Sequence, residues 1–163
     1  MVSLRLSRLE GHRRKCLAGI DDTPECQRAV HYAGSRAKNS NGSVVLLYVI
    51  ANGDFQQWLG VEEIMRAEAR EEAEAVLAKA AQALREAAGI EAEMVIREGV
   101  ASEAINGLIE EDRDIAILVL AAGSAKEGPG PLVSSLASRA QAFPIPVTVI
   151  PDQLSDEELD ALS

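Results

Sequence analysis

The stretch IAILVLAAGSAKEGPGPLVSSLASRAQAFPIPVTVIP, residues 115–151, decides the fold. Its first part, Ile115 to Ala121, is an apolar run without alternation, which is typical of a parallel strand buried on both faces. A loop rich in glycine and proline, a short helix and a second strand, Pro146 to Ile150, are predicted to follow. The stretch is thus one βαβ unit, and its loop opens at the carboxyl end of a strand, where α/β proteins bind ligands.

The rest of the chain repeats this alternation of strand and helix. Apolar runs at 16–20, 44–50 and 93–97 predict three more strands, and helices are expected between all five. Thr23 is expected to cap the first helix, with Pro24 at its first position. The longest helix, 61–88, is expected to bury one face made of Val61, Met65, Ala69, Ala73, Val76, Ala80, Leu84 and Ala87. The fold class is therefore α/β: a single doubly wound parallel sheet, order 3-2-1-4-5, with helices on both faces.

Length and charge narrow the functional classes. The 163 residues form one domain, and the net charge of −10 opposes binding to nucleic acid or to an anionic membrane surface. No apolar run approaches the roughly 20 residues that cross a bilayer, and the first residues lack the apolar core of a secretory signal. We therefore expect a cytoplasmic protein, with no nucleic-acid or membrane partner.

The two ends differ in charge from the domain at 15–151. Residues 1–14 are basic and are expected to form a flexible arm, whereas 152–163 are acidic. In the tail, Ser155 and Glu158 predict a capping box and Leu154 and Leu159 a hydrophobic staple, so a short helix is expected. This tail either docks onto the basic arm of its own or a partner chain or remains solvated.

The predicted sheet order brings the first and fourth strands together, with Asp21 facing the loop at 121–130. Asp21 accepts a hydrogen bond from a ligand or satisfies its own Asp-Asp-Thr turn. Ser134 and Ser135, expected near a helix start, bind an anion or only cap that helix. Lys126 neutralises a phosphate or is simply solvated.

Signals for catalysis are weak. His12 lies in the arm and His31 in the middle of the first helix, so neither is placed as a general base for a loop serine. Cys16 and Cys26 lack metal-binding spacing and are expected to be buried, reduced thiols. The glycine spacing of the loop matches a P-loop, but Pro129 stands where the lysine belongs. We expect neither an enzyme nor a metal site.

Several segments in order resemble the universal stress protein family: KCLAGIDDTPECQRAVHYA, VVLLYVI, VIREGVASEAI and DIAILVLAAGS, across about residues 15–151. The resemblance implies the 3-2-1-4-5 sheet, a cytoplasmic location and a role in stress responses rather than an established enzymatic activity. It also implies a homodimer paired through the last strand, here Pro146–Ile150.

Members of this family that bind ATP carry G-x2-G-x9-G-[ST] after the fourth strand. Ala121, Ser124, Ser134 and Ser135 take those positions here, so the spacing is intact but all three glycines are replaced. A Cβ at such a position resists a positive φ and close approach to phosphate. Gly123 and the two glycines further along the loop offer a differently shaped phosphate nest.

Two hypotheses follow from the resemblance. Asp21 matches the family's aspartate on the adenine side and Val49 its adenine-contacting position, which favours a homodimeric module that binds ATP or AMP, with Mg²⁺ only as the nucleotide's companion. The alternative is a nucleotide-free interaction module with a degenerate ATP site, which contacts an unidentified protein through the dimer, the Phe55 and Trp58 loop and the tail. Slow ATP hydrolysis would need a base and a metal ligand that the sequence does not identify.

Overall fold

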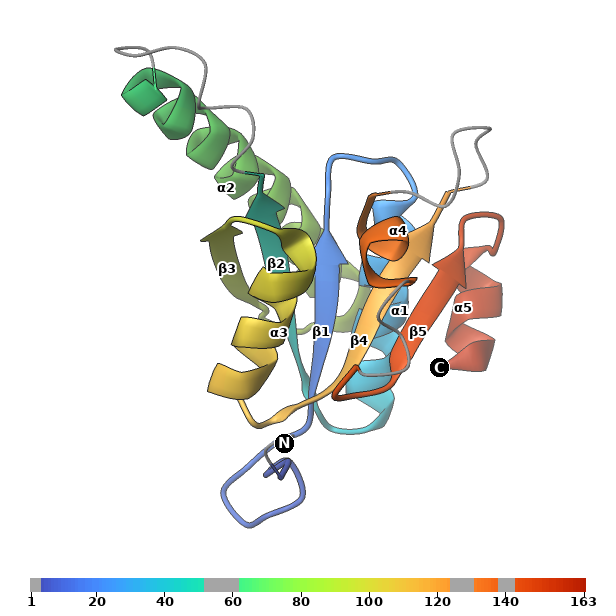
Figure 1. Ribbon diagram of the computed structural model, residues 1–163. Helices are drawn as coiled ribbons and strands as arrows, with labels where there is room; N and C mark the ends of the chain where they lie inside the picture. Colours follow the sequence, from blue (N-terminus) through green and yellow to red (C-terminus); the bar gives the residue numbers. More distant parts are fainter. Residues whose placement is uncertain (1–3, 52–61, 124–130, 138–142) are drawn as a thin grey trace.

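A five-stranded parallel sheet forms the centre of the molecule, in the order β3-β2-β1-β4-β5 (Figure 1). The computed structural model describes residues 4–51, 62–123, 131–137 and 143–163. The strands are β1 (Lys15–Ile20), β2 (Ser43–Ile50), β3 (Glu93–Glu98), β4 (Ile115–Ala122) and β5 (Val147–Pro151). The helices are α1 (Cys26–Asn39), α2 (Glu62–Ala88), α3 (Ala101–Glu111), α4 (Pro131–Ala137) and α5 (Asp156–Leu162). The predicted fold class and strand order are confirmed.

Two apolar clusters lie on the two faces of the sheet. Successive residues of β1 alternate between them: Cys16, Ala18 and Ile20 pack with α1, α2 and α5, whereas Leu17 packs with α3 and α4. Figure 1 shows the same division of the helices between the two faces. Because both faces are covered, the central strands are apolar throughout, which is why they show no alternation in the sequence.

The first helix begins later than the sequence predicts. α1 begins at Cys26, whose N–H donates to the backbone carbonyl of Thr23 at 3.3 Å and not to the Thr23 side chain that was expected to cap the helix. Thr23 instead donates its backbone N–H, at 3.1 Å, and its hydroxyl to Oδ1 of Asp21. The aspartate thus holds Thr23 and Pro24 in a turn before the helix, so the predicted start at Pro24 is wrong. At the other end of the helix, Asn41 takes the left-handed conformation that ends many helices, with a φ of +54°.

The buried face of α2 is rotated relative to the prediction. Ala73 and Leu84 are fully buried as expected, but Leu77 and Ala81 are buried with them, while Val76 and Ala80 are only partly covered. The predicted and the buried residues are therefore neighbours in the sequence, one position apart. Both sets fit the apolar pattern of the helix, and the packing of α2 on α1 and β2 decides which set is buried.

The basic segment before β1 is tied to the sheet rather than flexible. Its Leu6 N–H donates to the carbonyl of Arg113 at 2.9 Å, and Arg5 donates to the carbonyl of Ile109 at 2.7 Å. His12 also lies 2.7 Å from Asp114. These contacts fill the amino edge of the sheet, so the expectation of a free arm is wrong for residues 4–14.

The acidic tail forms the expected helix in an unexpected place. In α5, Ser155 accepts from the N–H of Glu158 at 3.2 Å and Glu158 accepts from the N–H of Ser155 at 2.8 Å, which confirms the capping box. α5 packs on α1, however, and Leu159 is fully buried there. The tail is therefore neither solvated nor docked on this chain's own basic segment.

Candidate functional site

The site expected from the sheet order is the crevice at the carboxyl ends of β1 and β4. The two strands pair in parallel, with Ala18 opposite Val119, so Asp21 and Gly123 follow their respective strands at the same edge. A direct contact joins the two connections: a carboxylate oxygen of Glu25 lies 2.7 Å from where a Cβ at Gly123 would stand. The predicted convergence of these two connections is confirmed. Ser124 and Lys126 lie outside the described residues.

Asp21 is half-buried, and its carboxylate serves its own turn through the two hydrogen bonds from Thr23. Burial raises the pKa of Asp21, and the neighbouring charges of Glu25 and Asp22 raise it further, while the Thr23 hydrogen bonds act in the opposite sense. The structure thus shows the local role that the sequence left open. The negative charge of Asp21 is destabilised by this environment, and a hydrogen-bond donor or a cation from a ligand would stabilise it.

Val49 is the described neighbour of Asp21 on the next strand. Ile20 of β1 pairs with Tyr48 of β2, so Val49 stands beside Asp21 one residue beyond that pair. Its side chain packs against the cluster under α3 and α4, on the face of the sheet that Leu47 also lines. This residue offers the crevice a half-buried apolar wall.

The other predicted site residues do not all lie on the same face of the sheet as the Val49 side chain. Ala121 packs in the opposite cluster, with α1, so its methyl group and the Val49 side chain lie on different faces of the sheet. Ser134 is exposed and is the fourth residue of α4, because the helix begins at Pro131. Proline has no N–H to offer at the first position of this helix, and the predicted anion site around Ser134 and Ser135 stays a prediction. The side chain of Ser135 lies outside the described residues.

Glu25 was not among the site residues predicted from the sequence. Three carboxylates, those of Asp21, Asp22 and Glu25, lie on the short connection between β1 and α1. The local signal was the acidic run DDTPE itself. The sequence of this run does not show that Glu25, its last residue, reaches the connection after β4.

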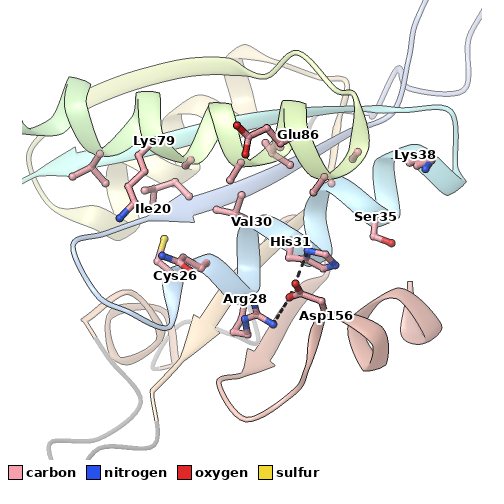
Figure 2. Close-up of a pocket in the computed structure, with 18 of the residues that line it drawn as sticks. Ile20, Cys26, Arg28, Val30, His31, Ser35, Lys38, Lys79, Glu86 and Asp156 are labelled. Carbon is pink, nitrogen blue, oxygen red and sulfur yellow. Dashed lines mark ion pairs between the residues drawn. The ribbon is translucent and has the colours of Figure 1, made fainter.

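A hollow of about 740 Å³ follows the outer side of α1 between α2 and α5 (Figure 2), and Asp21, Asp22 and Thr23 are among the residues that line it. Val30 and the small residues of α2 form its floor, and Lys79 and Glu86 project from α2 along its rim. Cys26 also lines it, and burial raises the pKa of this thiol to about 12. The thiol is therefore protonated at neutral pH and is not an activated nucleophile. This hollow was not predicted from the sequence.

Within residues 4–51, 62–123, 131–137 and 143–163, no group of three His, Cys, Asp or Glu side chains is placed to hold a metal ion. In that part of the chain, no helix has the length and apolar character needed to cross a membrane.

Comparison with known proteins decides the family. The model of the universal stress protein family matches residues 12–151, which is most of the chain. This chain belongs to the universal stress protein family. The match ends at the last residue of β5, so α5 lies outside it.

Solved universal stress proteins share this fold at low sequence identity. UspA from Lactobacillus plantarum is 17% identical, with a TM-score of 0.69 over 84% of this chain and 97% of that chain. A universal stress protein in complex with cAMP is 20% identical, with a TM-score of 0.60 over 86% of this chain and 98% of its own. The universal stress protein from Archaeoglobus fulgidus in complex with dAMP is 17% identical, with a TM-score of 0.57 over 84% and 97% of the two chains. No curated protein sequence matches this chain. At these identities the likeness establishes the fold alone. The ligand of this chain has to be argued from its own residues.

Proposed function

We propose that this universal stress protein is a cytoplasmic stress-response module that binds an adenine nucleotide in the crevice between β1 and β4. The observation that carries the proposal is the placement of Asp21 beside Val49 at the carboxyl edge of the sheet, directly next to the connection after β4. An adenine offers an amino group to a carboxylate and a flat apolar ring to a valine, so these two side chains match its two needs. Structural relatives solved with cAMP and with dAMP support the same ligand class.

The protein is proposed to act by binding rather than by catalysis. Asp21 accepts from the ligand's amino group and Val49 covers one side of the ring, and neither role transfers a proton or forms a bond. Mg²⁺ enters only as the companion of a bound phosphate. The occupied and empty crevices would then differ at the connections after β1 and β4, which is where a signalling partner would detect the ligand.

The protein is further proposed to be a homodimer paired along β5. β5 is an edge strand, so its outer backbone groups are available to pair with a second copy of the chain, and Val149, 44% exposed, adds an apolar side chain to that edge. Val149→Lys is expected to shift the mass measured by light scattering from dimer to monomer. Met94→Lys, at a 54% exposed residue of the opposite edge strand β3, is the matched control for a general effect of added charge. A wild-type monomer at micromolar concentration would contradict the dimer.

A second candidate function is a nucleotide-free interaction module. It is favoured by Ala121, whose methyl group points away from Val49, and by Ser134, which lies past the first turn of α4. In this case the protein would act through its surface and bind no adenine compound.

Ligand binding separates the two candidates. Protein purified and then denatured is analysed for released adenine compounds, and calorimetric titration measures binding of adenosine, AMP and ATP. Asp21→Asn is expected to weaken binding about tenfold or more, because an amide is a poorer acceptor than a carboxylate. Asp22→Asn removes the same charge from an exposed neighbour and is expected to leave adenosine binding nearly unchanged. Absence of any binding at millimolar ligand would contradict nucleotide binding and leave the interaction module.

A further inference from the structure

The side chain of Glu25 spans the crevice at its mouth. Glu25 is the residue before α1, and its carboxylate reaches the first residue after β4. Measured from the place where a Cβ at Gly123 would stand, Oε1 lies at 2.7 Å, Cδ at 3.1 Å and Oε2 at 3.6 Å. A Cβ at residue 123 would require the carboxylate at the end of the flexible Glu25 side chain to shift, so the glycine is what lets it lie this close to the backbone.

The charges around this contact are of one sign. Asp21 and Asp22 lie on the same connection as Glu25, and the pKa of Asp21 is raised chiefly by burial and also by the charges of Glu25 and Asp22. Among the described residues, no cation forms an ion pair with Glu25. The nearest arginine along α1, Arg28, is engaged elsewhere: it lies 2.6 Å from Asp156 and donates to the carbonyl of Leu154 at 3.0 Å.

A ligand phosphate would seek the same position that Glu25 takes. Phosphates at the carboxyl edge of a parallel sheet bind against backbone N–H groups of the connections, where small residues allow close approach. Gly123 is such a residue, yet its open side is filled by a carboxylate. A phosphate brought there meets a negative charge within a few ångströms, in a protein whose net charge is already −10.

We propose that Glu25 is a specificity-determining residue that limits the crevice to adenosine or a nucleoside monophosphate and excludes the triphosphate. This inference rests on the proposed binding of an adenine nucleotide and adds which members of that class are accepted. The base is held at Asp21 and Val49, whereas the number of phosphates is restricted at Glu25 and Gly123. A ligand with no phosphate or one leaves the carboxylate in place, while a triphosphate must displace it.

Titration calorimetry with adenosine, AMP and ATP tests the inference on the full-length protein. The variant is Glu25→Gln, which keeps the shape of the side chain and removes its charge. We expect the wild type to bind adenosine and AMP more tightly than ATP. Glu25→Gln is expected to raise the affinity for ATP about tenfold, the order of effect for one charge a few ångströms away at a partly exposed site, and to change adenosine binding less than about twofold.

Two controls keep the outcomes distinct. Asp22→Asn removes one charge from the same connection without touching Gly123, and it is expected to change ATP affinity less than Glu25→Gln does. Melting temperatures of the unliganded variants show that each is folded. An unchanged ratio of ATP to adenosine affinity in Glu25→Gln, or a wild type that prefers ATP, would overturn the role of Glu25 while leaving nucleotide binding intact. Absence of binding by the wild type and by Glu25→Gln would overturn the proposed function itself, and ATP binding by Glu25→Gln alone would support Glu25 as the barrier.

Discussion

The tail helix α5 offers a direct test of what holds the end of the chain in place. Leu159 is fully buried against α1. Around it, Arg28 lies 2.6 Å from Asp156, and His31 lies 2.8 Å from Asp160. Figure 2 shows Arg28 and His31 turned from α1 toward Asp156. The attachment therefore combines one buried apolar side chain with a ring of solvent-exposed polar contacts.

The perturbation is Leu159→Ala, and burial determines its size. Replacing a fully buried leucine by alanine typically costs about 2–5 kcal/mol. The surrounding ion pairs are exposed, and such pairs contribute only about 0–1 kcal/mol each. An isolated helix as short as α5, with 7 residues, is unstable in water. Once Leu159 is truncated, we expect α5 to detach as a unit, which limits the loss to about 2–3 kcal/mol.

Urea unfolding followed by far-ultraviolet circular dichroism measures this loss in the free energy of unfolding. Leu162→Ala is the matched control, because Leu162 lies on the same helix and is 62% exposed. That variant is expected to stay within about 0.5 kcal/mol of the wild type. Hydrogen exchange is expected to show loss of protection in α5 only for Leu159→Ala. A loss below about 1 kcal/mol, or equal losses for the two variants, would refute the reasoning that burial of Leu159 holds the tail.

Three further predictions concern glycine packing and pH. Gly42→Ala places a Cβ against a backbone carbonyl and is expected to cost about 1–3 kcal/mol in urea unfolding, whereas Gly107→Ala, in open space within α3, is expected to stabilise by about 0.5–1 kcal/mol. The pKa of Asp21 is raised in the folded protein, so its contribution to stability is fully present below the unfolded-state pKa and is lost as pH rises through the raised pKa. Asp21→Asn is expected to remove that fall in a series of urea unfolding curves at different pH, and an unchanged pH profile would contradict it. The hydrogen bond from His31 lowers the pKa of Asp160. Asp160 therefore adds to the free energy of unfolding above the ordinary carboxyl pKa, and this contribution is lost as pH falls through the lowered pKa. Asp160→Asn is expected to reduce the loss of stability at acid pH, measured by urea unfolding at a series of pH values.

The sheet could be predicted because its strands carry an unambiguous physical signal. β4 is buried on both faces and is therefore apolar at successive positions. In addition, each connection between strands has the length that a crossover between parallel strands requires. The helix boundaries carried a weaker signal. Thr23 has the chemistry of a cap, but the carboxylate two residues earlier competes for the same groups, and sequence alone does not rank the two.

The contacts of the two chain ends could not be predicted for a different reason. The capping box of α5 is local, with partners three residues apart, and the sequence contains it. The docking of that helix joins Arg28 to Leu154, which are 126 positions apart, and depends on where β5 delivers the chain. Charge complementarity suggested the basic segment before β1, yet that segment lies at the amino edge of the sheet and is already hydrogen-bonded to the connection before β4.

The candidate site combines both situations. Asp21 could be found from its place after an apolar strand, and Val49 from the family resemblance. The contact between Glu25 and Gly123 depends on how closely two connections approach, which no spacing rule encodes. Yet the sequence changes and this contact point in one direction. Side chains stand at the motif positions Ala121 and Ser134, where family members that bind ATP have glycine, and the glycine that remains beside the crevice receives a carboxylate rather than a phosphate. Loss of backbone room and gain of negative charge both disfavour a polyphosphate, and together they are the basis of the proposed preference for adenosine or its monophosphate over ATP.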